Sequence, residues 1–268
     1  MTETPILVAD SGPIRTITLN RPERRNALTA AMQSDLVAAL EDAAASGCRA
    51  LVLTGAGHAF CSGLDLADLR AMQDKSAAEY RAGAELIARL FRTLYEMPIP
   101  TIASVEGPAI AGGTGLATLC DFTLAAPDAK FGFTEARIGF VPALVSAFAA
   151  LQIGDKRCRD LFLTARLFDA EEALRLGLVN EVVPAERLPQ RVLEFAESLI
   201  ANSPQSIRLT KQLLAAQHRP WLDASIAAAI DASVQARETR DFREGVAAFL
   251  EKRSPAWPAP TDTTRQPD

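Results

Sequence analysis

Two segments of this chain, about fifty residues apart, share one plan: an apolar run typical of a buried strand, a glycine-marked turn and a helix start. The first segment joins residues 50–55 to residues 60–66, and the second joins residues 101–105 to residues 107–117. Turns of this kind can leave backbone N–H groups free to point at one place. Two such groups that converge on a carbonyl oxygen stabilise negative charge on it. The repeated plan therefore predicts a site for a developing oxyanion.

Strand-like and helix-like patterns alternate along the first two hundred residues. The apolar spacing predicts strands over residues 14–19, 122–126 and 179–183, and helices over residues 26–45 and 76–97. Beyond Pro184 the pattern is almost entirely helical. Its last parts are expected at residues 205–217 and 222–253, with a candidate break near Thr239. We therefore predict an α/β core over residues 1–200, a helical C-terminal region over residues 201–255, and a flexible, proline-rich tail over residues 256–268.

Composition limits the function classes. The chain has 268 residues and a net charge of −5, without a cluster of basic residues, so we expect no nucleic-acid partner. Its four cysteines lack the spacing of a metal site and are predicted to be reduced core residues, which fits the cytoplasm. The longest apolar stretch, residues 140–153, is shorter than the roughly twenty residues that a membrane span needs. We expect a soluble cytoplasmic protein without a metal.

Six motifs in order carry a resemblance to a known family. They lie at residues 20–28, 60–66, 107–121, 131–142, 168–180 and 243–252. Together they resemble the crotonase, or enoyl-CoA hydratase/isomerase, family over roughly residues 5–255. Within that family, residues 135–143 look most similar to bacterial hydratases of the methylglutaconyl-CoA type.

The resemblance implies a spiral of ββα repeats with a helical C-terminal trimerisation region, assembled as a homotrimer or a dimer of trimers. It also implies an acyl-CoA substrate, a place in fatty-acid or lipid metabolism, and no separate cofactor, since coenzyme A is part of the substrate. In the family, two backbone N–H groups hold the thioester oxygen. Carried over by position, these are the N–H groups of Leu64 and Gly112.

The same resemblance implies a groove for the CoA moiety. Its candidate contacts are Arg24, Arg25, Ala27, Ser62, Gly63, Leu64, Asp65, Leu66, Gly112 and Lys252. Alternative interpretations remain for four of these residues. Arg24, Arg25 and Lys252 could be solvated surface charges, and Asp65 could be the N-cap of a helix.

The chain departs from the family pattern at the acid/base residues. Typical hydratases carry two glutamates, one three residues beyond the second oxyanion glycine and one in the following loop. The first position is Gly115 here, and the second is Glu135. The resemblance therefore implies that Glu135 alone carries the proton chemistry.

A single carboxylate leaves three functions open. Glu135 could handle both proton steps of hydration, with the water held partly by backbone groups. It could instead move a proton between C2 and C4, as in a Δ3,Δ2-enoyl-CoA isomerase. The protein could also bind acyl-CoA without catalysis. We predict the first, an enoyl-CoA hydratase with Glu135 as general acid/base, because Glu135 and both oxyanion turns occur together.

Overall fold

Nine strands form two sheets in the part of the chain that the computed structural model describes, residues 4–71 and 75–257. The larger sheet has the order β1-β2-β3-β4-β6-β9, in which only the β1–β2 pair is antiparallel. Its strands are β1 (Ile6–Ser11), β2 (Ile14–Leu19), β3 (Ala50–Gly55), β4 (Thr101–Val105), β6 (Phe122–Ala125) and β9 (Glu181–Val182). The smaller sheet consists of β5 (Pro108–Ile110), β7 (Lys130–Gly132) and β8 (Leu167–Asp169).

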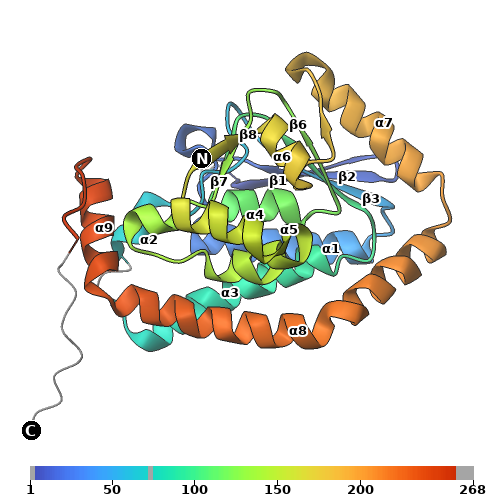
Figure 1. The fold of residues 1–268 in the computed structure, drawn as a ribbon. Helices are drawn as coiled ribbons and strands as arrows, with labels where there is room; N and C mark the ends of the chain where they lie inside the picture. The colour runs from blue at the N-terminus through green and yellow to red at the C-terminus, as the bar shows by residue number, and fades with distance from the viewer. Residues whose placement is uncertain (1–3, 72–74, 258–268) are drawn as a thin grey trace, which may run out of the picture.

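Helices cover both faces of the larger sheet (Figure 1). In chain order they are α1 (Ala30–Ala45), α2 (Leu66–Ala71), α3 (Ala77–Tyr95), α4 (Gly112–Leu119), α5 (Ala143–Thr164), α6 (Ala170–Leu176), α7 (Leu188–Ile200), α8 (Pro204–Glu238) and α9 (Arg240–Leu250). The α7 helix lies on one side of the sheet, whereas α1, α3, α4 and α5 lie on the other, with α8 running beneath them. This arrangement confirms the expected α/β fold with a helical C-terminal region.

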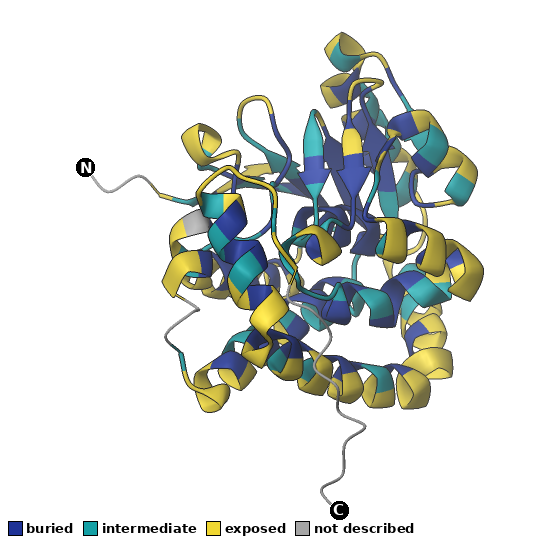
Figure 2. Ribbon diagram, turned by 60° about the vertical axis from the view of Figure 1, so that its left-hand side comes forward, coloured by how far each residue is buried: buried dark blue, intermediate teal, exposed yellow. Residues whose placement is uncertain are grey.

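The alternation of side chains along the strands divides the core between these two layers. Leu51 and Leu53 of β3 face the cluster that includes α1 and α3, whereas Ala50 and Val52 face the cluster formed with α7. Figure 2 shows the strands buried between the helices. Because both faces are covered, the central strands β3 and β4 are mostly apolar and almost entirely buried.

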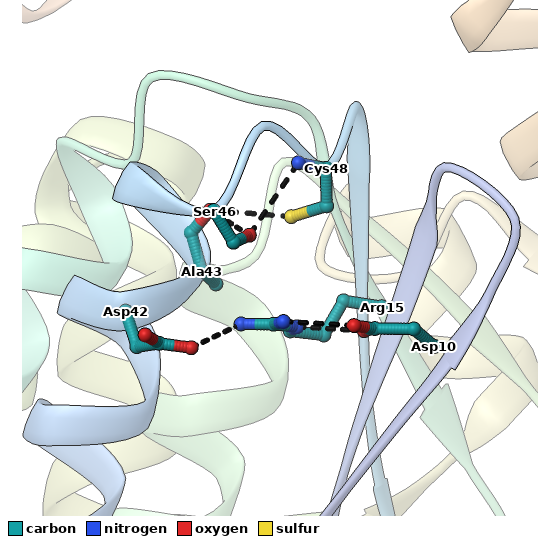
Figure 3. A network of polar contacts seen from close by, with 6 residues as sticks. All are labelled: Asp10, Arg15, Asp42, Ala43, Ser46 and Cys48. Carbon is teal, nitrogen blue, oxygen red and sulfur yellow. Dashed lines mark hydrogen bonds and ion pairs between the residues drawn. The ribbon is translucent and has the colours of Figure 1, made fainter.

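A buried arginine joins the first hairpin to the first helix (Figure 3). Arg15 of β2 is only 7% exposed, and its Nε lies 2.7 Å from Asp10 Oδ1 in β1. Its Nη1 lies 2.5 Å from Asp42 Oδ2 in α1. Two carboxylates thus compensate one buried guanidinium. Cys48, at the end of the turn after α1, donates its thiol to the Ala43 carbonyl.

Helix boundaries follow capping residues. Thr29 and Ser76 cap α1 and α3, and Ser76 forms a capping box with Glu79. Thr239 ends α8 and caps α9, which confirms the break expected there.

One helix is longer than the sequence indicated. We expected separate helices on either side of Pro220, but α8 continues through it. The helix packs along α3 and α5, and Arg81 of α3 pairs with Asp231 of α8 at 2.6 Å. Such tertiary contacts offset the hydrogen bond that proline removes. Within α5 the sequence predicts two helical segments, one from Pro142 to Ala150 and one over residues 155–164. The structure confirms this, because Gly154 takes a non-helical φ of 77° and kinks the helix between them.

None of the helices in the described ranges combines the length and apolar character that a membrane crossing requires. Residues 258–268, most of the expected flexible tail, lie outside the described residues. The division of the chain at residue 200 stays a prediction.

Candidate active site

A cavity of about 910 Å³ lies where the two glycine turns meet. Its walls come from the loop between β2 and α1, both turns, the α3 helix, the segment after β7, and the ends of α8 and α9. The cavity therefore collects residues from the whole length of the chain.

The first turn is held in shape by the buried side chain of Asn26. Its Nδ2 donates to the carbonyls of Ala56 (2.9 Å) and Ala59 (2.7 Å). Farther along, Leu28 N–H donates to the Gly63 carbonyl and Asp65 N–H donates to the Leu28 carbonyl. These bonds leave the intervening N–H, that of Leu64, without an acceptor among the described residues.

The second turn presents its free N–H at the start of α4. Ala111 takes the unusual φ of 53° before Gly112 begins the helix. Thr114 Oγ1 fixes the turn by donating to the Ala109 carbonyl (2.6 Å) and accepting from Gly132 N–H (3.1 Å). The Gly112 N–H has no acceptor within the described ranges and lies at the positive end of the α4 dipole.

The two turns touch each other through glycines. A Cβ atom on Gly113 would lie 2.1 Å from the Cys61 carbonyl oxygen, which no side chain tolerates. A Cβ on Gly63 would lie 3.2 Å from the Ile110 carbonyl oxygen and 3.9 Å from Gly112 N. This close approach brings the Leu64 and Gly112 segments together at the cavity, as an oxyanion site requires.

Glu135 is a buried carboxylate on the same cavity. It begins a short 3₁₀ helix (Glu135–Ile138), is 8% exposed, and its Oε2 has no hydrogen-bond partner among the described residues. Burial raises the pKa of Glu135 to about 7, although a hydrogen bond from its own backbone N–H opposes the shift. A carboxyl group with this pKa can both take and return a proton near neutral pH.

The position of Gly115 is filled by neighbouring side chains. A Cβ placed there would lie 2.9 Å from Val145 Cγ2 and 3.0 Å from Phe91 Cζ. These apolar groups come from α5 and α3, and both line the cavity. A second carboxylate at position 115 would therefore require these two side chains to move. The other acidic residues that line the described cavity, Glu23 and Asp65, come from the loop before α1 and from the first turn.

Comparison with known proteins then identifies the family. The family model described as Enoyl-CoA hydratase/isomerase matches residues 10–260. The chain belongs to this family, the crotonases. A Thermus thermophilus relative, provisionally named an enoyl-CoA hydratase, is 45% identical across 92% of this chain and 98% of its own length. The crotonyl-CoA hydratase of Syntrophomonas wolfei is 35% identical across 92% and 95% of the two chains.

Solved structures agree with the crotonase fold. The crystal structure of an enoyl-CoA hydratase from Mycobacterium avium subsp. paratuberculosis has a TM-score of 0.85 and 28% identity, and the match covers 96% of this chain and 99% of that one. The expected crotonase-like fold is thereby confirmed.

Most of the residues expected to contact CoA in this crotonase lie on the cavity wall. Those that do are Arg24, Arg25, Ala27, Ser62, Gly63, Leu64, Asp65 and Gly112. The side chain of Leu66, at the start of α2, lies outside the described part of the structure. Lys252 is exposed just after α9 and does not line the cavity, whereas Phe249 and Arg253 do. Contact of any of these residues with CoA stays a prediction.

Asp65 has a structural role that the sequence offered as an alternative. Its Oδ1 accepts the Ala67 N–H at the start of α2 (2.8 Å), and its Oδ2 pairs with Arg21 Nη1 (2.9 Å). Burial acts to raise the pKa of Asp65, but these hydrogen bonds outweigh it and hold the pKa below its ordinary value. Asp65 thus stays charged and secures the first turn.

Sequence reasoning missed three features of the site: Asn26 as the support of the first turn, Arg21 as the partner of Asp65, and Arg237 in the cavity wall. Arg21 and Asp65 are forty-four residues apart, so their pairing leaves no local pattern. Arg237 does carry a signal. It continues the buried stripe of α8 four residues after Ser233, where an apolar side chain would be ordinary.

Proposed function

We propose that this crotonase is an enoyl-CoA hydratase, which reversibly adds water across the 2,3 double bond of a 2-enoyl-CoA thioester. The N–H groups of Leu64 and Gly112 hold the thioester oxygen, and Glu135 serves as general acid/base. The relatives named as hydratases support the reaction class.

One observation carries this proposal. The unpartnered Oε2 of Glu135 shares a cavity with two backbone N–H groups that also lack an acceptor within the described residues. Buried polar groups normally find partners, so three open ones in one cavity favour a polar ligand. A thioester carbonyl and a water molecule would satisfy them.

The chemistry follows from this arrangement. Glu135 as carboxylate takes a proton from water while the water oxygen bonds to C3. The electron pair of the double bond moves onto the thioester oxygen, where the two N–H groups stabilise the enolate. Protonated Glu135 then returns the proton to C2. One carboxylate suffices because it ends the cycle in its starting state.

Ultraviolet absorbance of the enoyl thioester tests the proposal. Purified protein should remove the absorbance of crotonyl-CoA or 3-methylglutaconyl-CoA and yield the 3-hydroxyacyl-CoA, identified by mass spectrometry. Unchanged absorbance with both substrates would refute the hydratase. Binding of acyl-CoA without any turnover would instead favour a non-catalytic family member.

A Δ3,Δ2-enoyl-CoA isomerase is the second candidate, supported by the filled space at Gly115. Phe91 and Val145 pack against Gly115, so apolar groups stand where typical hydratases carry their first glutamate. A shuttle between C2 and C4 needs one carboxylate and no water. Conversion of a 3-enoyl-CoA to its 2-enoyl form, without a hydrated product, would establish this function.

We also propose a homotrimer or a dimer of trimers, without a cofactor beyond the CoA of the substrate, in the cytoplasm and in lipid metabolism. Exposed apolar side chains on α8 support assembly through the C-terminal helices: Leu209, Leu213, Leu214 and Trp221. Light scattering with size-exclusion chromatography measures the subunit number.

A further inference from the structure

Arg237 places a buried positive charge in the cavity wall. The residue stands in the last turn of α8 and is 2% exposed. Among the described residues it forms no ion pair, and its hydrogen bonds run from Nη1 alone, to the carbonyl and hydroxyl oxygens of Ser233. Nε and Nη2 donate to none of the described residues. An unpaired buried guanidinium is costly, so this position demands an explanation.

The same chain shows how a buried arginine is normally compensated. Arg15 is buried to a similar degree, and two carboxylates, Asp10 and Asp42, pair with it. Asp65, another buried charge, pairs with Arg21. The buried acidic and basic side chains in the described ranges are those of Arg15, Asp65, Glu135 and Arg237. The last two have no ion-pair partner there, and both line the cavity.

Aromatic rings form the surroundings of Arg237. Its guanidinium carbon lies 4.6 Å from the centre of the Phe140 ring and 5.9 Å from that of Tyr80. Burial lowers the pKa of Arg237 to about 10, opposed by the charge of Tyr80, and the group therefore remains a cation near neutral pH. Stacking on rings holds the guanidinium in place and leaves its edge available to a planar anion.

The location of Arg237 indicates which part of a substrate it would meet. Arg21, Arg24 and Arg25 line the cavity from the loop between β2 and α1, the proposed CoA end, whereas Arg237 stacks on Phe140, which follows Glu135 in the chain, and on Tyr80 of α3. A group that reaches Arg237 would be the far end of the acyl chain.

We propose that this enzyme acts on acyl-CoA thioesters whose acyl chain ends in a carboxylate, which Arg237 binds through Nε and Nη2. This carboxylate would pair with the guanidinium of Arg237, which has no acidic partner among the described residues. This substrate class rests on the proposed function, because the same cavity must hold the thioester at Leu64 and Gly112.

Binding of saturated acyl-CoA ligands tests the proposal without requiring turnover. Calorimetry would compare pairs of equal carbon number: glutaryl-CoA with pentanoyl-CoA, adipoyl-CoA with hexanoyl-CoA, and pimeloyl-CoA with heptanoyl-CoA. At one length or more, the dicarboxylic ligand should bind at least tenfold tighter. No preference at any length would overturn the proposal.

Substitutions then assign the preference to Arg237. Arg237→Met should weaken binding of the preferred dicarboxylic ligand about 30-fold or more, while its methyl-terminated partner changes less than threefold. Arg237→Lys should keep part of the preference. Arg240→Met, which removes an exposed charge three residues away, is the matched control and should leave both affinities unchanged. Equal weakening of both ligand series by Arg237→Met would indicate a purely structural role and overturn the proposal.

Turnover separates this proposal from the hydratase itself. Hydration of crotonyl-CoA without a carboxylate preference would leave the hydratase standing and refute the role of Arg237. Tighter binding of the dicarboxylic ligands without hydration of any 2-enoyl-CoA would support the role of Arg237 and refute the hydratase. Thermal unfolding shows whether Arg237→Met folds. If it does not, the preference of the wild-type protein for dicarboxylic over methyl-terminated ligands still tests the proposal.

Discussion

The oxyanion side and the proton-transfer side of the cavity are built in different ways. The Leu64 and Gly112 N–H groups belong to the main chain, and Asn26 and Thr114 fix the two turns that carry them. Proton transfer depends on one side chain, Glu135, whose Oε2 has no supporting partner among the described residues. A substitution can therefore remove the proton carrier directly, whereas it reaches the two N–H groups only by displacing the backbone that carries them.

The sharpest test of this difference is Glu135→Gln. The amide preserves shape but cannot take a proton from water, so kcat should fall about 10²- to 10⁴-fold while the affinity for a saturated acyl-CoA is retained. Steady-state kinetics and calorimetry measure the two effects. Glu197→Gln, at an exposed position of α7, serves as the control. Full turnover by Glu135→Gln would remove Glu135 from the mechanism.

The oxyanion side should lose its function only when the backbone of the two turns is displaced. Gly113→Ala places a methyl group 2.1 Å from the Cys61 carbonyl, so the two turns must separate. We expect kcat to fall about 10²-fold or more and stability to fall by about 1–3 kcal/mol. Gly83→Ala in α3 has no atom within 4 Å of its added Cβ and should stabilise the protein slightly. Normal kinetics for Gly113→Ala would contradict the proposed geometry.

The pH dependence of activity and stability should next distinguish the proton-transfer side of the cavity from the oxyanion side. Catalysis starts from the Glu135 carboxylate, so kcat/KM should rise about tenfold per unit as pH approaches the pKa of about 7, then level off. Because the folded pKa exceeds the unfolded value, the protonated form favours folding. That stabilisation is complete below pH 4.5 and disappears as pH rises through 7.

Thermal unfolding against pH measures this contribution. Glu135→Gln should lack it and unfold at a higher temperature than the wild type above pH 7. Identical pH profiles for the two proteins would show that Glu135 is not buried as described.

The smallest effects should come from the supports of the first turn. Arg21→Met leaves Asp65 without its partner, so we expect about 1–3 kcal/mol lower stability and a KM for acyl-CoA several-fold higher. Arg24→Met, at an exposed residue of the same loop, should raise KM without loss of stability if Arg24 contacts CoA. Chemical denaturation and initial rates measure both. Unchanged stability of Arg21→Met would show that the ion pair between Arg21 and Asp65 contributes little to the free energy of unfolding.

The sequence was sufficient for those parts of the site that local patterns carry. Strands of matching apolar pattern, the two glycine turns and the segment of Glu135 all lie where they were expected, because each is set by a short run of residues. The surroundings of Gly115 were not predictable in this way. Phe91 and Val145 reach it from helices that are distant in sequence, and only packing brings them there.

The course of α8 teaches the same lesson. Pro220 predicts a break, but contacts with α3 and α5 keep the helix continuous. That continuity carries the last turn of α8 to the cavity and with it Arg237. At Pro220, tertiary packing outweighs the local preference for a break.

The packing around Gly115 also bears on how one crotonase can change into another. A glutamate introduced there would need room now taken by Phe91 on α3 and Val145 on α5. A single substitution to glutamate at position 115 would therefore force both neighbouring side chains to shift. A change from one carboxylate to two would thus involve residues on three helices, α3, α4 and α5, and Gly115→Glu should be tolerated better after Phe91 and Val145 are replaced by smaller side chains.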